Sequence, residues 1–174
     1  MNIKRLITNA SVTFLMISGV QAQTQVGSVN TFYGEVGLSP VEVSGAGGDA
    51  RPFAVRLLVG NELTKNLGLD LMYTATISKD SRSGYNAYFN GLGLFVKPKV
   101  ALTEGTEVFA RLGVLRSDIT ASTAGRDLGT DIAYGVGIQT YFTKTVYGQF
   151  DYMHSYDRDN VAAKGFTVSA GTRF

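Results

Sequence analysis

The sequence has no cysteine, one histidine and only three prolines in 174 residues. Without cysteine the folded chain gains no stability from disulfides, so other interactions must hold it together. A transition-metal site would need cysteine or a second histidine, and the sequence has neither. We therefore predict no disulfide, no bound metal and no cofactor.

An excess of charge of one sign is also missing. The chain has 16 Lys and Arg residues against 14 Asp and Glu residues. Two of the basic residues, Lys4 and Arg5, lie in the N-terminal segment, so the two signs balance in the remainder. A surface that binds nucleic acid would leave a clustered basic excess. The composition therefore argues against a nucleic-acid partner.

Long apolar runs are absent beyond the N-terminal segment. The basic pair Lys4-Arg5 precedes a mostly apolar stretch, residues 6–20, and Val20-Gln21-Ala22 has the small-x-small pattern of a signal peptidase site. A helix that anchors the protein in a membrane would need about 20 apolar residues, and this stretch is shorter. We predict a signal peptide at residues 1–22 and one mature domain at residues 23–174.

Glycine and aromatic residues are abundant, with 21 Gly, 10 Phe and 9 Tyr, a composition that suits a β-barrel. A turn followed by an alternating segment occurs three times, beginning at Leu63, Leu102 and Phe142, at spacings of 39 and 40 residues. A fixed period of this kind indicates a repeated architectural unit. Three tight turns that alternate with four longer loops predict eight strands.

Alternation of apolar and polar residues with period two places these strands. The expected strands are residues 31–38, 52–60, 67–76, 87–97, 106–116, 130–141, 145–155 and 165–174. The expected long loops are residues 39–51, 77–86, 117–129 and 156–164. Pro98 is expected just past the fourth strand, where a missing N–H is tolerated.

Charged residues share one face of the expected strands, and the Leu and Val residues take the other. The charged face carries Glu35, Arg56, Asp70, Lys97, Glu107, Arg111, Asp131, Asp151 and Arg173. The exception is Arg116, expected at the end of its strand, whose long stem can carry its charge to the membrane interface. A soluble barrel with its faces exchanged would show the same separation, so charge alone leaves two kinds of barrel open.

Glycine and aromatic residues separate these two kinds of barrel. The charged face also carries Gly68, Gly91, Gly93, Gly113, Gly135, Gly137 and Gly171. An eight-stranded barrel is only just wide enough inside for side chains, so small residues are expected there. Aromatic residues fall at the loop end (Phe53, Tyr73, Tyr88, Tyr134, Tyr152, Phe166) and at the turn end (Phe32, Phe174) of the apolar face. Such girdles are typical of outer-membrane barrels. The sequence therefore predicts an all-β fold, an eight-stranded antiparallel up-and-down transmembrane β-barrel.

The turn-strand of residues 63–73, the G-L-G-L of residues 91–94 and the aromatic C-terminal strand resemble small eight-stranded outer-membrane barrel proteins. These are the opacity proteins and the transmembrane domain of outer-membrane protein A. The resemblance implies a location in the outer membrane of a Gram-negative bacterium, in contact with outer-membrane lipid and lipopolysaccharide. It also implies that the barrel-assembly machinery reads the C-terminal strand that ends in Phe174. We expect a monomer.

The charged lumen residues are the first candidate site. Buried charges that stay unpaired are costly, so we expect a paired network that fills the barrel. The alternative is a gated ion path through a narrow pore.

His154 is the second candidate, because it stands beside Ser155. An eight-stranded outer-membrane lipid A deacylase uses a His-x-Ser motif followed by Asn, whereas here Ser155 is adjacent and Tyr156 follows. Adjacent residues of a strand lie on opposite faces, which disfavours a nucleophile–base pair. We expect a histidine at the barrel rim, and a lipid A-modifying enzyme remains the alternative.

Two loop motifs complete the candidates. Asp157-Arg158-Asp159 is expected to be a solvated loop, and its alternative role is to bind a divalent cation or lipopolysaccharide. Gly45-Ala46-Gly47-Gly48 lacks the strand–helix context of a phosphate-binding loop. We therefore predict no catalytic, cofactor-binding or metal-binding residue. The expected function is non-enzymatic, in envelope structure or in adhesin-like surface interaction.

Overall fold

The computed structural model describes residues 30–45, 48–78, 87–121, 125–158 and 161–174. The predicted signal peptide at residues 1–22 lies outside these ranges. Within them, no helix is long and apolar enough to cross a bilayer.

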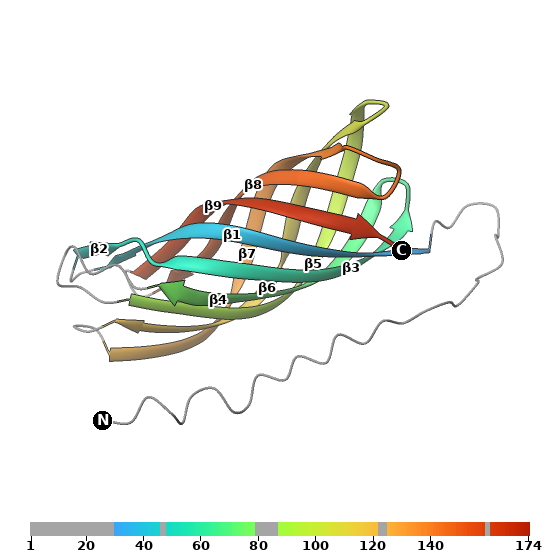
Figure 1. The fold of residues 1–174 in the computed structure, drawn as a ribbon. Helices are drawn as coiled ribbons and strands as arrows, with labels where there is room; N and C mark the ends of the chain where they lie inside the picture. Colours follow the sequence, from blue (N-terminus) through green and yellow to red (C-terminus); the bar gives the residue numbers. More distant parts are fainter. Residues whose placement is uncertain (1–29, 46–47, 79–86, 122–124, 159–160) are drawn as a thin grey trace, which may run out of the picture.

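The described chain forms strands that pair with antiparallel neighbours. They are β1 (Thr31–Gly45), β2 (Gly48–Ala50), β3 (Phe53–Thr64), β4 (Leu67–Ser78), β5 (Ala87–Thr103), β6 (Thr106–Ala121), β7 (Gly125–Tyr141), β8 (Val146–Arg158) and β9 (Val161–Arg173). Their order is β2-β1-β3-β4-β5-β6-β7-β8-β9, and β9 also pairs with β1. Eight long strands thus close into a barrel, with β2 as a short extension paired to the outer end of β1 (Figure 1). The predicted fold class is confirmed.

Several strands are longer at the loop end than predicted. β1 continues to Gly45, β6 continues to Ala121 and β7 begins at Gly125. In the same way β8 continues to Arg158 and β9 begins at Val161. The expected loops at residues 39–51, 117–129 and 156–164 are therefore largely strand, and the predicted boundaries there are wrong. Their Ser, Ala and Gly content favours loops on composition alone, but pairing with a neighbouring strand decides the outcome.

The prediction that the fourth strand ends before Pro98 is also wrong. β5 continues to Thr103 and pairs with β6 again from Lys99 onward. The β5–β6 register has no partner pair at Pro98, so the missing N–H falls at an interruption of this ladder.

Another proline interrupts the ladder that closes the barrel. β1 and β9 pair on both sides of Pro40, but not at Ser39 or at Pro40 itself. The Ser39 hydroxyl instead donates a hydrogen bond to the Phe166 carbonyl oxygen at 2.9 Å. This bond gives the carbonyl a partner beside a proline that has no N–H to offer.

We expect Ser39→Ala to lower the free energy of unfolding by about 1 kcal/mol, because the Phe166 carbonyl loses its donor. Urea unfolding of the barrel refolded into phospholipid vesicles measures this change. Ser44→Ala, on the same strand, is the matched control and should unfold like the wild type. Equal shifts for the two variants would contradict this role of Ser39.

The pairing of β7 with β8 is also interrupted toward the loop end of the barrel. Their pairing stops at Tyr134–His154, although β7 stays paired with β6 as far as its first residue. Asp131 lies in the gap. One carboxylate oxygen accepts the N–H of Ile132 at 3.1 Å, and the other accepts the N–H of Asp157 on β8 at 3.4 Å. Asp131 therefore bridges two strands at a place where the ladder is missing.

The two faces of the wall differ as predicted. Large apolar side chains such as Val36, Leu71 and Val136 point outward and are more than half exposed in the isolated barrel. The predicted lumen charges are buried at Glu35, Arg56, Asp70, Lys97, Arg111 and Asp151, and half-buried at Glu107, Asp131 and Arg173. Arg116 is exposed on the outer wall, but it is not the last residue of its strand.

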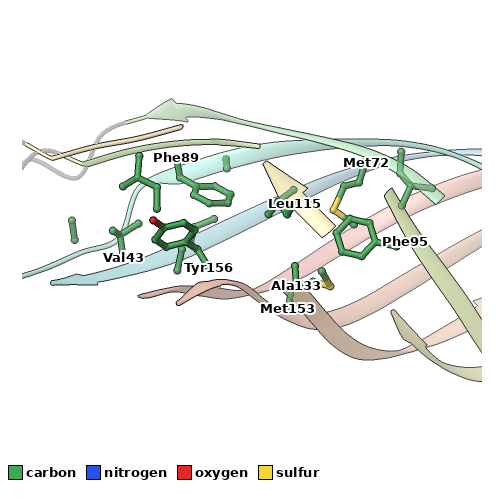
Figure 2. Packing of buried hydrophobic residues seen from close by; sticks show 14 of the residues in the cluster. Val43, Met72, Phe89, Phe95, Leu115, Ala133, Met153 and Tyr156 are labelled. Carbon is green, nitrogen blue, oxygen red and sulfur yellow. The ribbon is translucent and has the colours of Figure 1, made fainter. Parts of the chain in front are cut away.

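The interior changes character along the barrel axis. Outward from the central charges, the next inward-facing residues on β4, β5 and β8 are Met72, Phe95 and Met153. They form part of a buried apolar cluster with Leu115 and Ala133, which continues toward the loop end through Phe89, Val43 and Tyr156 (Figure 2). The lumen is thus charged toward the turns and apolar toward the loops.

Candidate functional site

Arg111 of β6 is the centre of a buried group of charges. We call Glu35, Arg56, Asp70, Lys97, Arg111 and Asp151 the central cluster. Arg111 donates from Nε to Asp70 Oδ2 at 2.7 Å and from Nη2 to Glu35 Oε2 at 3.1 Å, and its Nη1 lies 3.5 Å from Asp151 Oδ1. One guanidinium therefore contacts three carboxylates from three other strands.

The other two cations complete this network. Both terminal nitrogens of Arg56 donate to the two oxygens of Asp151, the bidentate geometry in which Arg–carboxylate pairs are strongest. Lys97 Nζ lies 3.3 Å from Glu35 Oε1 and 4.6 Å from the ring centroid of Phe109. The central cluster holds three cations and three carboxylates, so its formal charges cancel.

Two tyrosines donate hydrogen bonds to carboxylates of the central cluster. The Tyr33 hydroxyl donates to Asp70, and the Tyr147 hydroxyl donates to Glu35 Oε1 at 2.9 Å. Tyr33 is the cross-strand partner of Gly60, and its ring occupies the space that a Cβ at Gly60 would need. Tyr147 and Gly171 repeat this arrangement on β8 and β9. A glycine thus lets each ring lie against the strand and reach its carboxylate.

A smaller group of charges lies nearer the turns. We call Glu62, Lys99, Glu107 and Arg173 the end cluster. Lys99 Nζ lies 2.6 Å from Glu62 Oε1 and 3.2 Å from Glu107 Oε2, and Arg173 Nη2 lies 2.6 Å from Glu62 Oε1. Its two cations and two carboxylates also cancel. Gln139 connects the clusters, since it accepts from Lys97 at 3.0 Å and donates to Glu107 at 3.4 Å.

Glu62 and Lys99 are lumen residues that the sequence pattern did not predict, because the expected strands end at Gly60 and Lys97. The alternation of inward and outward positions along the two strands does indicate these residues. Glu62 keeps the inward parity of Arg56 and Gly60, and Lys99 keeps that of Lys97. The predicted paired network is confirmed for eight of its nine charges, each of which has an oppositely charged partner. The ninth, Asp131, instead accepts two backbone N–H groups.

His154 lies on the outer wall at the loop end. Its ring stacks on that of Tyr134 with centroids 5.1 Å apart, and its Nε2 lies 3.5 Å from Asp157 Oδ2. Ser155 occupies a register shift between His154 and Tyr156. Among the described residues no hydrogen bond joins His154 to Ser155, so the structure does not bring them together as a nucleophile and base.

The loop motifs fall partly on residues that the structure does not describe. Asp159 lies outside the described ranges, and Asp157 contacts His154. Gly45 pairs with Gly48, and residues 46 and 47 between them also lie outside the described ranges. No group of three His, Asp or Glu side chains in the described segments could hold a metal ion.

Comparison with known proteins agrees with this architecture. The family described as "Outer membrane protein beta-barrel domain" matches residues 10–174. No curated protein sequence matches the chain.

Solved structures are similar in fold. The attachment invasion locus protein Ail of Yersinia pestis, in complex with the heparin analogue sucrose octasulfate, has a TM-score of 0.62 and 20% identity, covering 83% of this chain and 99% of Ail. Neisserial surface protein A has a TM-score of 0.61 and 18% identity, covering 82% of this chain and 95% of its own. The N-terminal barrel domain of Pseudomonas aeruginosa OprF has a TM-score of 0.59 and 17% identity, covering 80% and 97%. At these identities the likeness concerns the fold.

Proposed function

The chain belongs to the outer membrane protein β-barrel domain family, and on this basis we propose that it has a non-enzymatic role in envelope structure and surface interaction. It is an integral protein of a Gram-negative outer membrane. The observation that carries the proposal is the filled lumen, in which two charge-neutral clusters lie below an apolar layer. An interior filled in this way leaves no room for a wide water-filled channel. The surface at the loop end is therefore the part of the barrel most suited to interaction with other molecules.

Three partners follow from the same proposal. Outer-membrane lipid and lipopolysaccharide surround the barrel. The barrel-assembly machinery reads β9, whose outward residues Phe166 and Val168 alternate toward the exposed Phe174.

The barrel is a monomer, and residues 1–22 act as its signal peptide.

The proposal is tested with bacteria that display the barrel and bind to heparin-coated beads. Heparin is the probe because Ail was solved with a heparin analogue. We expect several-fold more bound cells than with an empty vector. A variant in which a short Gly-Ser turn replaces residues 120–126 is the matched control, because it shortens the β6–β7 hairpin and keeps the buried Ile119 with its partners on β5 and β7. This variant should bind less.

Two measurements on the purified barrel cover the other candidate functions. Stable conductance in planar bilayers would support the narrow pore and contradict the proposal. A change in the mass of lipid A that disappears in His154→Ala would support the lipid-modifying enzyme and also contradict it. We expect neither. Bead binding no greater than with the empty vector would contradict the adhesive part.

A further inference from the structure

A groove crosses the lipid-facing wall at the point where the closing ladder is interrupted. It has a volume of about 610 Å³ and is lined mainly by Pro40, Glu42, Arg51, Tyr152, Lys164 and Phe166. On β1, β8 and β9 these residues have the outward parity, so the groove opens on the outside of the barrel. We call it the seam groove.

The part of the seam groove that lies nearer the turn end of the barrel is lined by aromatic side chains. The Phe166 ring is 52% exposed and lies 4.9 Å from the ring of Tyr152, between centroids. The Phe150 ring also stacks on the Phe166 ring, with centroids 5.5 Å apart. The Tyr152 and Phe166 rings belong to the aromatic girdle at the loop end, where the acyl chains of the outer leaflet meet their head groups. The groove therefore spans the boundary between apolar and polar parts of a lipid.

The part of the seam groove that lies nearer the loop end of the barrel holds two cations, which form ion pairs with the same carboxylate. Arg51 Nη2 lies 3.2 Å from Glu42 Oε2, and Lys164 Nζ lies 3.7 Å from Glu42 Oε1. The side chains of Arg51 and Lys164 are 71% and 41% exposed, so both can turn toward a second anion. These three residues carry one net positive charge, and they lie directly above the aromatic rings.

We propose that the seam groove binds a phosphorylated glycolipid of the outer leaflet, with Lys164 and Arg51 contacting a head-group phosphate. The acyl chains then lie along Phe166 and Tyr152. Charge complementarity selects this occupant, because a phosphate can contact an ammonium and a guanidinium at once and an uncharged head group cannot. Glu42 holds the two cations together, and it competes with the phosphate for them. The inference rests on the proposed contact with outer-membrane lipid and adds the place and the chemistry of that contact.

The test uses the full barrel refolded into phosphatidylcholine nanodiscs and titrated with bis-phosphorylated or dephosphorylated lipid A. Retained lipid is measured by native mass spectrometry. We expect the wild type to prefer the phosphorylated lipid, and Arg51→Gln with Lys164→Gln to lose about tenfold in affinity for it. The affinity for dephosphorylated lipid A should not change. Glu42→Gln should raise the affinity for the phosphorylated lipid, because it removes the competing carboxylate.

Lys144→Gln is the matched control, since Lys144 is an exposed cation in a turn at the opposite end of the barrel. It should bind like the wild type, and heat-modifiable migration on gels checks that every variant is folded. Excess inorganic phosphate should not displace the lipid, because it lacks acyl chains. Equal affinity of the double variant and the wild type for phosphorylated lipid A would overturn the proposal, as would an equal loss for both lipids. Bead binding is measured separately on cells, so the two proposals can fail independently.

Discussion

Arg111→Met is expected to destabilise the barrel by about 3–5 kcal/mol, because it leaves carboxylates buried without their central cation. Arg111 is fully buried and contacts Asp70, Glu35 and Asp151. Glu35 keeps Lys97 as a partner and Asp151 keeps Arg56, but among the described residues Asp70 keeps only the hydroxyl of Tyr33. Methionine fills much of the same volume, so the loss measures the charge interactions rather than a cavity.

Urea unfolding in phospholipid vesicles and heat-modifiable migration measure this loss. Arg116→Met is the matched control, since Arg116 is an exposed arginine on the same strand. Its effect should stay within about 0.5 kcal/mol. Adding Asp70→Asn to Arg111→Met should restore part of the stability, because it removes the carboxylate with the fewest remaining partners. The same unfolding midpoint for Arg111→Met and Arg116→Met would show that the central cluster does not stabilise the barrel.

Gly60→Val is expected to destabilise the barrel by about 3 kcal/mol, through overpacking and the loss of one buried hydrogen bond. A side chain at Gly60 occupies the place of the Tyr33 ring. If the ring moves, its hydroxyl leaves Asp70, which then keeps Arg111 as its one partner in the described part of the chain. The glycine is required here because an aromatic side chain covers it from the neighbouring strand.

Gly34→Val on β1 is the control for Gly60→Val. A Cβ at Gly34 would have no neighbour closer than 3.9 Å, and the site faces lipid. This variant should unfold like the wild type. Gly171→Val should repeat the effect of Gly60→Val, because Tyr147 covers Gly171 in the same way. Equal unfolding midpoints for Gly34→Val and Gly60→Val would contradict the role of the tyrosine–glycine pairs.

The face of the barrel wall on which each charged residue lies could be predicted from the sequence, because side-chain alternation is a local property of a strand. It places Arg56, Asp70 and Arg111 in the lumen without knowledge of which strands are neighbours. The pairing of these charges could not be predicted. Arg111 and Glu35 are 76 residues apart, and only the closed register brings them together.

Departures from regular strands, such as register shifts and gaps in the pairing, could not be predicted from the sequence either. The register shift at Ser155 reverses the alternation, so Tyr156 points into the apolar part of the lumen although it was expected in a loop. Asp131 has the inward parity that was expected, but it binds two backbone N–H groups in the gap between β7 and β8. Such positions depend on where a neighbouring strand turns away, and a local pattern carries no information about that.

The equal numbers of cations and carboxylates in each cluster have an electrical consequence. A charge that moves across a membrane potential gains or loses energy in proportion to its size. The formal charges of the central cluster sum to zero, and those of the end cluster do as well. Moving each cluster as a unit through a membrane potential therefore involves almost no net work against that potential. A Donnan potential across the outer membrane should therefore leave the contribution of these two clusters to insertion unchanged.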